Sequence, residues 1–371
     1  MRHRFAVVAL LGFIGWQWAE AQVTTSAVPF LLIAPNSRAS AMGESGVALG
    51  DDAWAIFWNP AGYAFQTNSE VALTQANWLP AFGLSDLWIA HGVYKQPWEE
   101  VNGVVAVGLT YLNLGEFVRT TNTPDPIETW KGYEVALALG YGTKIGENTG
   151  LGVNTRLIYS SLANLGAGVE QGRGVATGFS FDVAVLYKPT SLFIPFTDVD
   201  VGNVMTFGAN LSNIGPKLTY IDEAQADALP MNLRLGLSWK VLESQYNNIT
   251  FIGDVSRLLI HKDTTHTDEF YEAFVTTWTK GGSLSEQLRQ FVTGLGAEYW
   301  YGDPKLVAIR VGFFYEDPRA GNRKFMTFGA GIRYDIYGFD FSYISAFEDQ
   351  HPLGETLRFS LAIEWGSLSI Q

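Results

Sequence analysis

The stretch "TLRFSLAIEW" covers residues 356–365, close to the C-terminus. Its apolar side chains occupy every second position: Leu357, Phe359, Leu361, Ile363 and Trp365. The residues between them are polar, charged or small. Because side chains of a β-strand alternate between its two faces, this pattern predicts a strand with one apolar and one polar face. The apolar face of such a strand contacts either a protein core or lipid.

The same alternation recurs along the chain and favours lipid. It is clearest in "GFSFDVAVLYK" (178–188), "MNLRLGLSWK" (231–240), "LVAIRVGFFY" (306–315) and "KFMTFGAGIRYDIY" (324–337). Several apolar rows end in an aromatic residue with a polar group, namely Tyr187, Trp239, Tyr315 and Trp365. A soluble β-sandwich also alternates, but Tyr and Trp at the ends of the rows are typical of the girdles at membrane interfaces.

Counting such segments after residue 67 predicts an even number of strands. Fourteen candidates begin near Ser69, Leu84, Val101, Trp130, Gly150, Gly174, Val201, Leu229, Asn248, Arg289, Lys305, Asn322, Gly338 and Glu355. An even antiparallel set closes without a free edge. We therefore predict an all-β fold: a fourteen-stranded transmembrane antiparallel β-barrel over residues 68–371, with an N-terminal luminal plug.

The lengths of the connections support this topology. Long connections such as 115–130, 160–174, 212–230 and 261–288 alternate with mostly short ones, as extracellular loops alternate with periplasmic turns in outer-membrane barrels. The segment "KPTSLFIPFTDVDVG" (188–202) is long on the side that should be short, and the pattern does not explain it.

The N-terminus predicts export. Arg2 and Arg4 precede an apolar run from Phe5, and Ala19-Glu20-Ala21 forms a small-residue cleavage site. This arrangement is typical of a secretory signal peptide over residues 1–21, and the apolar run is too short for a membrane-spanning helix. Residues 22–67 are too many for a simple lead-in to the first strand, so we expect them to fold as a plug (hatch) within the lumen of an outer-membrane barrel.

Composition and residue types narrow the chemistry. The chain has no cysteine, which excludes disulfides and thiol catalysis, and its net charge of −13 argues against nucleic acid as a partner. "HKDTTHTDE" (261–269) is a loose metal candidate, but a solvated loop is the better interpretation because the sequence implies no rigid scaffold. No nucleophile with a base and no paired catalytic carboxylates emerge, so we expect no enzyme, no cofactor and no metal site.

Two blocks of sequence resemble a known family. "ALGDDAWAIFWNPAGYAF" (48–65) resembles the N-terminal hatch of the FadL-like outer-membrane barrels. "IAPNSRASAMGESGVAL" (33–49) and the C-terminal segments 321–344 and 351–365 are similar to the PorV/PorQ branch of that family, which belongs to the type IX secretion system. One departure is that "GSLSIQ" follows Trp365, whereas many outer-membrane barrels end on an aromatic residue.

The hatch motif has a structural and a functional interpretation. Its candidate residues are Asp51, Asp52, Trp58, Asn59, Pro60 and Gly62. The Asn-Pro pair favours a turn, because proline fixes φ and asparagine can bond its own backbone. The two aspartates could bind a cation, but a helix cap or turn is the better interpretation.

Charged residues on the polar strand faces should line the lumen. They are Arg156, Asp182, Lys188, Arg234, Arg310, Arg333, Asp335, Arg358 and Glu364. They could form a permeation path, or internal ion pairs that close the barrel around its plug. We favour ion pairs because both signs are interleaved.

The resemblance implies that the chain binds secreted cargo by its C-terminal signal domain at the translocon barrel and carries it to a cell-surface attachment complex containing a sortase. The partner-binding candidate is the loop segment 268–280, where Phe270, Phe274, Val275 and Trp278 have roughly helical spacing above the outer-membrane lipid. The stripe could equally pack on neighbouring loops. Two alternatives remain: a FadL-type channel for hydrophobic small molecules, which requires an apolar pocket beneath the loops, and a structural barrel without cargo.

Overall fold

The computed structural model describes residues 26–83, 86–120, 126–163, 174–222, 225–263, 266–348 and 351–366. The predicted signal peptide, residues 1–21, and the predicted strand start at Leu84 lie outside the described residues. Among the described residues, no helix has both the length and the hydropathy needed to cross a bilayer.

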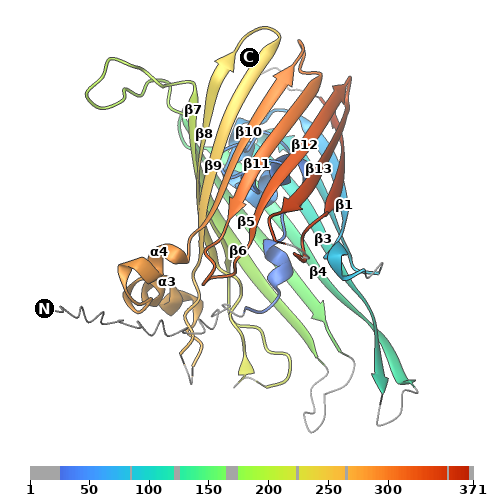
Figure 1. Ribbon diagram of the computed structural model, residues 1–371. Helices are drawn as coiled ribbons and strands as arrows, with labels where there is room; N and C mark the ends of the chain where they lie inside the picture. The colour runs from blue at the N-terminus through green and yellow to red at the C-terminus, as the bar shows by residue number, and fades with distance from the viewer. Residues whose placement is uncertain are drawn as a thin grey trace, which may run out of the picture.

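Fourteen antiparallel strands form one closed barrel in which β1 pairs with β14 (Figure 1). The strands are β1 (Ser69–Asn77), β2 (Trp88–Trp98), β3 (Gly103–Thr120), β4 (Pro126–Lys144), β5 (Thr149–Ser161), β6 (Val175–Tyr187), β7 (Met205–Ile214), β8 (Asn232–Glu243), β9 (Asn247–Leu258), β10 (Val292–Tyr301), β11 (Val307–Tyr315), β12 (Lys324–Tyr334), β13 (Tyr337–Ala346) and β14 (Leu357–Trp365). The predicted fold class is confirmed.

Eight short helices accompany the described strands. They are η1 (Pro29–Leu32), α1 (Ser37–Ser40), α2 (Ala55–Trp58), η2 (Pro60–Phe65), η3 (Pro80–Phe82), η4 (Glu99–Val101), α3 (Phe270–Thr279) and α4 (Leu284–Arg289).

The two faces of the strands differ as the alternation predicts. In β6, Phe179, Phe181 and Val183 are exposed on the outer face, while Ser180 and Asp182 are fully buried on the inner face. In a transmembrane barrel an outward row of this kind contacts acyl chains.

Aromatic girdles mark both ends of the outer wall. Trp88, Tyr111, Tyr133 and Tyr159 form a row across β2 to β5, with successive ring centroids 5.2, 6.0 and 5.9 Å apart. Tyr94 and Trp365 stack near the opposite end, with centroids 6.2 Å apart. Amphipathic rings prefer the interface between lipid and water, so the two girdles bound the lipid-facing band.

We call the two ends of the barrel the loop end and the turn end. The loop end carries the connections 78–87, 121–125, 162–174, 215–231, 259–291, 316–323 and 347–356 and faces down in Figure 1. The turn end carries 99–102, 145–148, 188–204, 244–246, 302–306 and 335–336, together with the start of β1 and the end of β14. Long and short connections thus alternate with two exceptions: 188–204 is long at the turn end, and only five residues (121–125) connect β3 to β4 at the loop end.

One predicted long connection is mostly strand. Residues 115–120 and 126–130, expected to be loop, extend the β3–β4 hairpin well beyond the rim (Figure 1). A register shift follows Asn113, and beyond it Phe117 stacks on Trp130 with ring centroids 5.8 Å apart. Beyond the rim none of the described neighbouring strands pairs with the hairpin, so these cross-strand contacts stabilise it.

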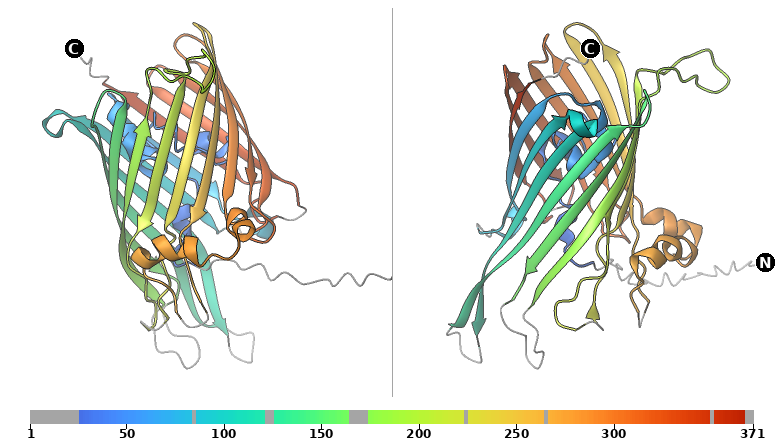
Figure 2. Two further views of the ribbon diagram at one scale, coloured as in Figure 1. Left: turned by 90° about the vertical axis from the view of Figure 1, so that its left-hand side faces the viewer. Right: turned by 180° about the vertical axis from the view of Figure 1, so that it is seen from behind.

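The N-terminal residues 26–68 lie inside the barrel (Figure 2). The backbone N–H of Ala27 donates to the carbonyl of Ala228 in a loop-end connection, at 2.9 Å. From there the segment passes η1, α1, α2 and η2 and reaches the turn end, where β1 begins at Ser69. The plug therefore runs through the lumen from the loop end to the turn end.

Close contact between plug and wall depends on glycine. Gly43 has φ of 67°, and a Cβ there would lie 2.6 Å from the carbonyl oxygen of Leu295 on β10. The position therefore excludes other residues both by its left-handed backbone and by the space available.

Candidate functional site

A chain of buried ion pairs connects the plug to the wall. Arg38 of α1 donates two hydrogen bonds to Glu298 of β10, both at 2.8 Å. Its third nitrogen contacts Asp51 at 2.7 Å and Asp52 at 3.2 Å. Because Arg38 and Glu298 are both buried, this bidentate pair is much less screened than a surface pair.

The network of ion pairs continues along the barrel wall. Arg310 contacts Glu298 and Asp340, both at 2.7 Å, and Arg333 reaches the second oxygen of Asp340 at 2.7 Å. Arg310 and Arg333, expected to face the lumen, are thus brought into one network with the plug aspartates. Arg38, Glu298 and Asp340 were not singled out from the sequence, although Glu298 and Asp340 also lie on polar faces of alternating strands.

A second polar cluster lies on β5, β6 and β7. Arg156 and Asp182 form an ion pair at 2.9 Å, and Asp182 accepts a hydrogen bond from the backbone N–H of Asn213 at 2.8 Å. Asn154 donates both to Asp182 and to the carbonyl of Ile56 in α2, at 3.0 and 2.6 Å. This cluster also links the wall to the plug.

Two further arginines contact the plug segment before α2. Arg234 donates to the carbonyl of Glu44 at 3.2 Å, and its guanidinium lies 4.7 Å from the ring centroid of Trp58. Arg358 lies 3.9 Å from the carboxylate of Glu44. Both arginines therefore contact Glu44.

The other three expected luminal charges lie at the turn end. Lys188 stands over the ring of Phe65 in the plug, 4.5 Å from its centroid. Glu364 follows the inner-face register of β14 but is exposed. The expectation for Asp335 is wrong: it is exposed in the turn between β12 and β13, with φ of 53°, because the strand ends one residue earlier.

Asn59 of the hatch motif is fully buried and shapes the plug. Its side chain accepts from the N–H of Ala61 at 3.1 Å, capping η2, and donates to the carbonyls of Val47 and Val185 at 2.9 and 3.0 Å. Pro60 occupies the first position of η2, where a missing N–H costs nothing. Asn59 therefore fixes one plug turn against another and against β6.

The remaining motif residues pack or bond within the plug. Trp58 donates to the side chain of Asn36 at 2.9 Å, and a Cβ at Gly62 would overlap the backbone of Gly50. Asp52 accepts from the N–H of Trp54 at 3.0 Å, as a turn at the start of α2 requires.

Little space remains between plug and wall. Near β2 to β5, Phe30, Trp54, Ile56 and His91 line a cavity of about 40 Å³. That volume suits a water molecule, whereas small-molecule sites usually enclose about 300–1,000 Å³.

A helical hairpin stands outside the wall at the loop end (Figure 2). It consists of α3 and α4, and each helix begins with a reciprocal capping box, formed by Glu269 with Glu272 and by Ser283 with Glu286. The N–H and hydroxyl of Ser283 donate to Glu286, and the side-chain hydrogen bond is the main reason that the pKa of Glu286 lies below its ordinary value. Both helix starts are therefore defined by local hydrogen bonds.

Arg257 on the outer face of β9 anchors this hairpin. Its side chain is buried beneath α3 and donates to the carbonyl of Thr277 and to the side chain of Gln290, both at 2.8 Å. The guanidinium lies 4.2 Å from the ring centroid of Trp278 and 5.5 Å from that of Phe291. The hairpin is thus fastened beside the barrel rather than above its mouth.

The apolar stripe of α3 differs from the predicted one in one residue. Phe270 packs on the cluster of Met231, Leu259 and Ala273, on the covered side of the helix. The exposed α3 stripe, which we define as Tyr271, Phe274, Val275 and Trp278, follows the spacing i, i+3, i+4, i+7 and is 63, 50, 56 and 36% exposed. Phe270 is not part of the exposed stripe because it shares the covered helix face with the buried Ala273 and Thr277. Tyr271 is exposed in its place.

Two other exposed apolar groups were missed from the sequence. Leu284 and Leu288 of α4 are 73 and 60% exposed. In the 188–204 connection Phe193, Ile194, Phe196 and Val199 are exposed at the turn end. That connection is organised by Asp200, whose pKa lies below its ordinary value because backbone N–H groups of Leu192 and Gly202 donate to it.

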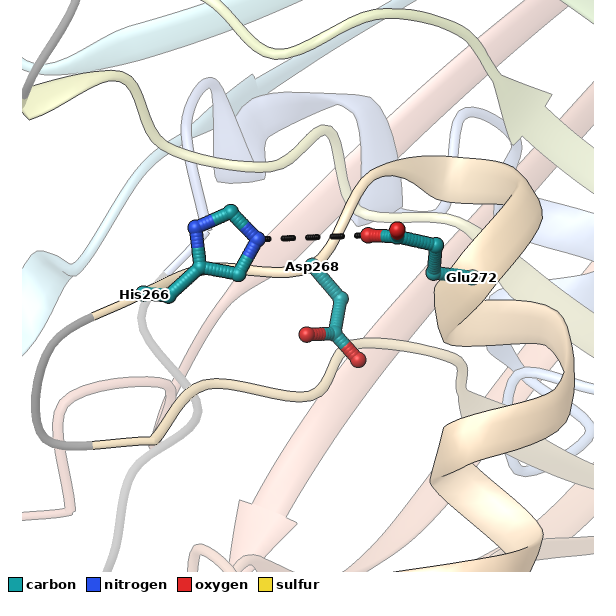
Figure 3. Close-up of side chains that lie close together, drawn as sticks. All are labelled: His266, Asp268 and Glu272. Atoms are coloured by element: carbon teal, nitrogen blue, oxygen red, sulfur yellow. Dashed lines mark ion pairs between the residues drawn. The ribbon is translucent and has the colours of Figure 1, made fainter.

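Three potential metal ligands meet where residues 266–268 lead into α3 (Figure 3). His266, Asp268 and Glu272 each bring one ligand atom to within 4.8 Å of the other two. His266 Nε2 and Glu272 Oε2 are 3.9 Å apart. The interpretation of 261–269 as a loop without a scaffold omitted the first turn of α3.

Comparison with known proteins gives one family and a set of similar solved structures. The profile of the family described as type IX secretion system protein PorV matches residues 17–265. No curated protein matches the chain.

Similar solved structures include the Pseudomonas putida toluene transporter TodX, with 12% identity, 90% of this chain and 98% of that chain covered, and a TM-score of 0.49. The monoaromatic hydrocarbon channel CymD has 13% identity, covers 90 and 96%, and has a TM-score of 0.48. A FadL homologue of Pseudomonas aeruginosa has 13% identity, covers 89 and 98%, and has a TM-score of 0.44.

Proposed function

This chain belongs to the PorV family of type IX secretion system proteins, and from that membership we propose a role in carrying secreted cargo. The barrel binds the C-terminal signal domain of the cargo protein at the translocon barrel. It then carries the cargo to an attachment complex that contains a sortase. The chain is an outer-membrane barrel of that secretion system. The proposed role is binding and transfer and requires no catalysis.

The observation that carries this proposal is the exposed α3 stripe on an anchored hairpin. Exposed apolar side chains on a helix that is already capped and fastened lose little conformational freedom on binding, which favours recognition of a partner. Phe274 and Val275 are 50 and 56% exposed, and large apolar anchors dominate the energetics of such interfaces. We therefore assign cargo binding to this stripe.

The tightly held plug also supports recognition of cargo outside the lumen. Buried ion pairs connect the plug to β10, and the cavity beside the plug measures only about 40 Å³. A FadL-type channel for hydrophobic small molecules would need a larger apolar pocket or displacement of the plug. Cargo recognition at the outer hairpin requires neither.

The test changes the stripe without disturbing its anchors. Phe270 and Trp278 are unsuitable because they pack on the loop cluster and on Arg257. Replacing Phe274 and Val275 with Ser should weaken retention of a purified signal-domain protein at least tenfold, because each anchor contributes about 1–2 kcal/mol. The measurement is a pull-down by detergent-solubilised barrel, normalised to barrel amount.

The matched control replaces Leu284 and Leu288 of α4 with Ser, since both are as exposed as the stripe residues. This control should retain the signal domain as wild type does. Equal retention by the stripe variant would remove the stripe from the mechanism. If wild type retains no signal domain while cells take up hydrophobic small molecules through it, the channel would replace our proposal.

A further inference from the structure

The segment that leads into α3 brings three metal-ligating side chains together by regular geometry. Thr267 forms an isolated bridge with Lys262, so His266 and Asp268 flank an extended residue and project to the same side. Glu272 occupies the N3 position of α3, and its carboxylate turns back to accept from the N–H of Glu269 at 3.0 Å. The helix thus directs Glu272 toward the other two side chains.

The charges around these side chains favour a cation. Within the described part of the chain, no Lys or Arg nitrogen lies within 4.0 Å of the carboxylates of Asp268 or Glu272. The nearby Lys217 contacts Glu269 at 2.9 Å, and Lys262 contacts Asp227 at 3.3 Å. One carboxylate oxygen of Asp268, one of Glu272 and one nitrogen of His266 therefore lie within 4.8 Å of one another without a Lys or Arg from the described residues beside the two acids.

Asp268 is held in place by its own contacts. It is 6% exposed, and its Oδ2 accepts from the hydroxyl of Thr276, one helical turn beyond Glu272, at 2.5 Å. A hydrogen bond to a ligating carboxylate fixes its orientation, as at established metal sites. His266 and Glu272 are exposed, so their side chains can rotate to complete the coordination.

From this geometry we propose that His266, Asp268 and Glu272 bind a divalent transition metal ion of the zinc class. One imidazole and two carboxylates suit Zn²⁺, whereas Ca²⁺ and Mg²⁺ prefer oxygen ligands alone. Tetrahedral ligands at zinc lie about 3.4 Å apart, so the three atoms need to approach by about 1 Å. Water completes the coordination, and the bound ion ties residues 266–268 to the first turn of α3.

This site can be tested independently of cargo binding. The mature barrel in detergent is freed of metal with a chelator and titrated with Zn²⁺ alone, and bound zinc is counted after dialysis. We expect one zinc per chain. Binding should weaken at least tenfold in each of His266→Gln, Asp268→Asn and Glu272→Gln.

These substitutions preserve the local fold. Gln can replace Glu272 in a capping box, and Asn can still accept from Thr276. Two controls match them: Glu286→Gln removes the same charge from the same position of α4, and His261→Gln removes the other histidine of the segment. Both controls should bind zinc as wild type does.

Three outcomes would overturn the proposal. They are absence of saturable zinc binding in wild type, unchanged binding in the ligand variants, and equal loss in the two controls. The heat-dependent gel shift of each variant reports whether its barrel has formed.

Discussion

Glu298→Gln tests whether the luminal ion pairs hold the plug. Glu298 is 3% exposed and accepts from Arg38 twice and from Arg310 once, at 2.7–2.8 Å. Gln has the same size, so it creates no cavity, but it removes the negative charge between two buried guanidinium groups.

The expected loss of unfolding free energy depends on which carboxylate partners each arginine retains. Removing one partner of a buried ion pair costs about 3–5 kcal/mol. Arg38 retains Asp51 and Asp52, and Arg310 retains Asp340. We therefore expect a loss near the lower limit, about 3 kcal/mol of unfolding free energy.

Two assays measure this effect. Urea unfolding in lipid vesicles gives the free energy, and trypsin reports on the plug, because a released plug exposes Arg38 to cleavage. The matched control is Glu243→Gln, whose partner Lys240 lies 3.3 Å away with both side chains half exposed. An exposed pair contributes about 0–1 kcal/mol. If Glu298→Gln and Glu243→Gln destabilise the barrel equally and Arg38 stays uncut, the ion pairs do not retain the plug.

Three further predictions address topology, the hatch and the hairpin. In this cysteine-free chain, a single cysteine at Pro29 should react with an impermeant maleimide on intact cells and one at Gln245 should not, since the two lie at opposite ends; equal labelling would contradict the orientation. Asn59→Ala removes three side-chain hydrogen bonds to the backbone and should lower the urea unfolding free energy by about 2–4 kcal/mol; an unchanged value would contradict the role of Asn59 in the plug. The Glu286 carboxyl should titrate in NMR below its ordinary pKa, so the α4 cap persists above that ordinary value and is lost as pH falls through the lowered one; a normal or raised pKa would refute the cap.

The sequence predicted the barrel because lipid imposes a simple rule on every strand. Phe359 and Leu361 face acyl chains and Arg358 and Ser360 face the lumen, so period 2 persists from one strand to the next. The rule fails where lipid is absent. Above the rim the β3–β4 hairpin has water on both sides, and its extension depends on cross-strand pairs that alternation does not predict.

The contacts of the site were less predictable, because they join residues far apart in the chain. Arg38 and Glu298 are separated by 260 residues, and no local pattern indicates that they meet. The stripe of α3 shows a second limit of prediction from the sequence. Spacing identified a helix with apolar residues, but whether Phe270 or Tyr271 is covered depends on Met231 and Leu259, which approach from another loop.

The plug's route through the lumen also constrains how this protein is assembled. The N–H of Ser37 donates to the hydroxyl of Ser360, 323 residues later, and that of Gly43 to Thr327, 284 residues later. Contacts of such separation form slowly, because closing a long loop costs entropy before the contact can stabilise it. The plug therefore cannot take its final place until the last strands are present, so closure of the barrel and seating of the plug are coupled. A chain that stops before β14 cannot close its barrel, so a leaky pore is the expected product of any truncation that removes β14 (Leu357–Trp365).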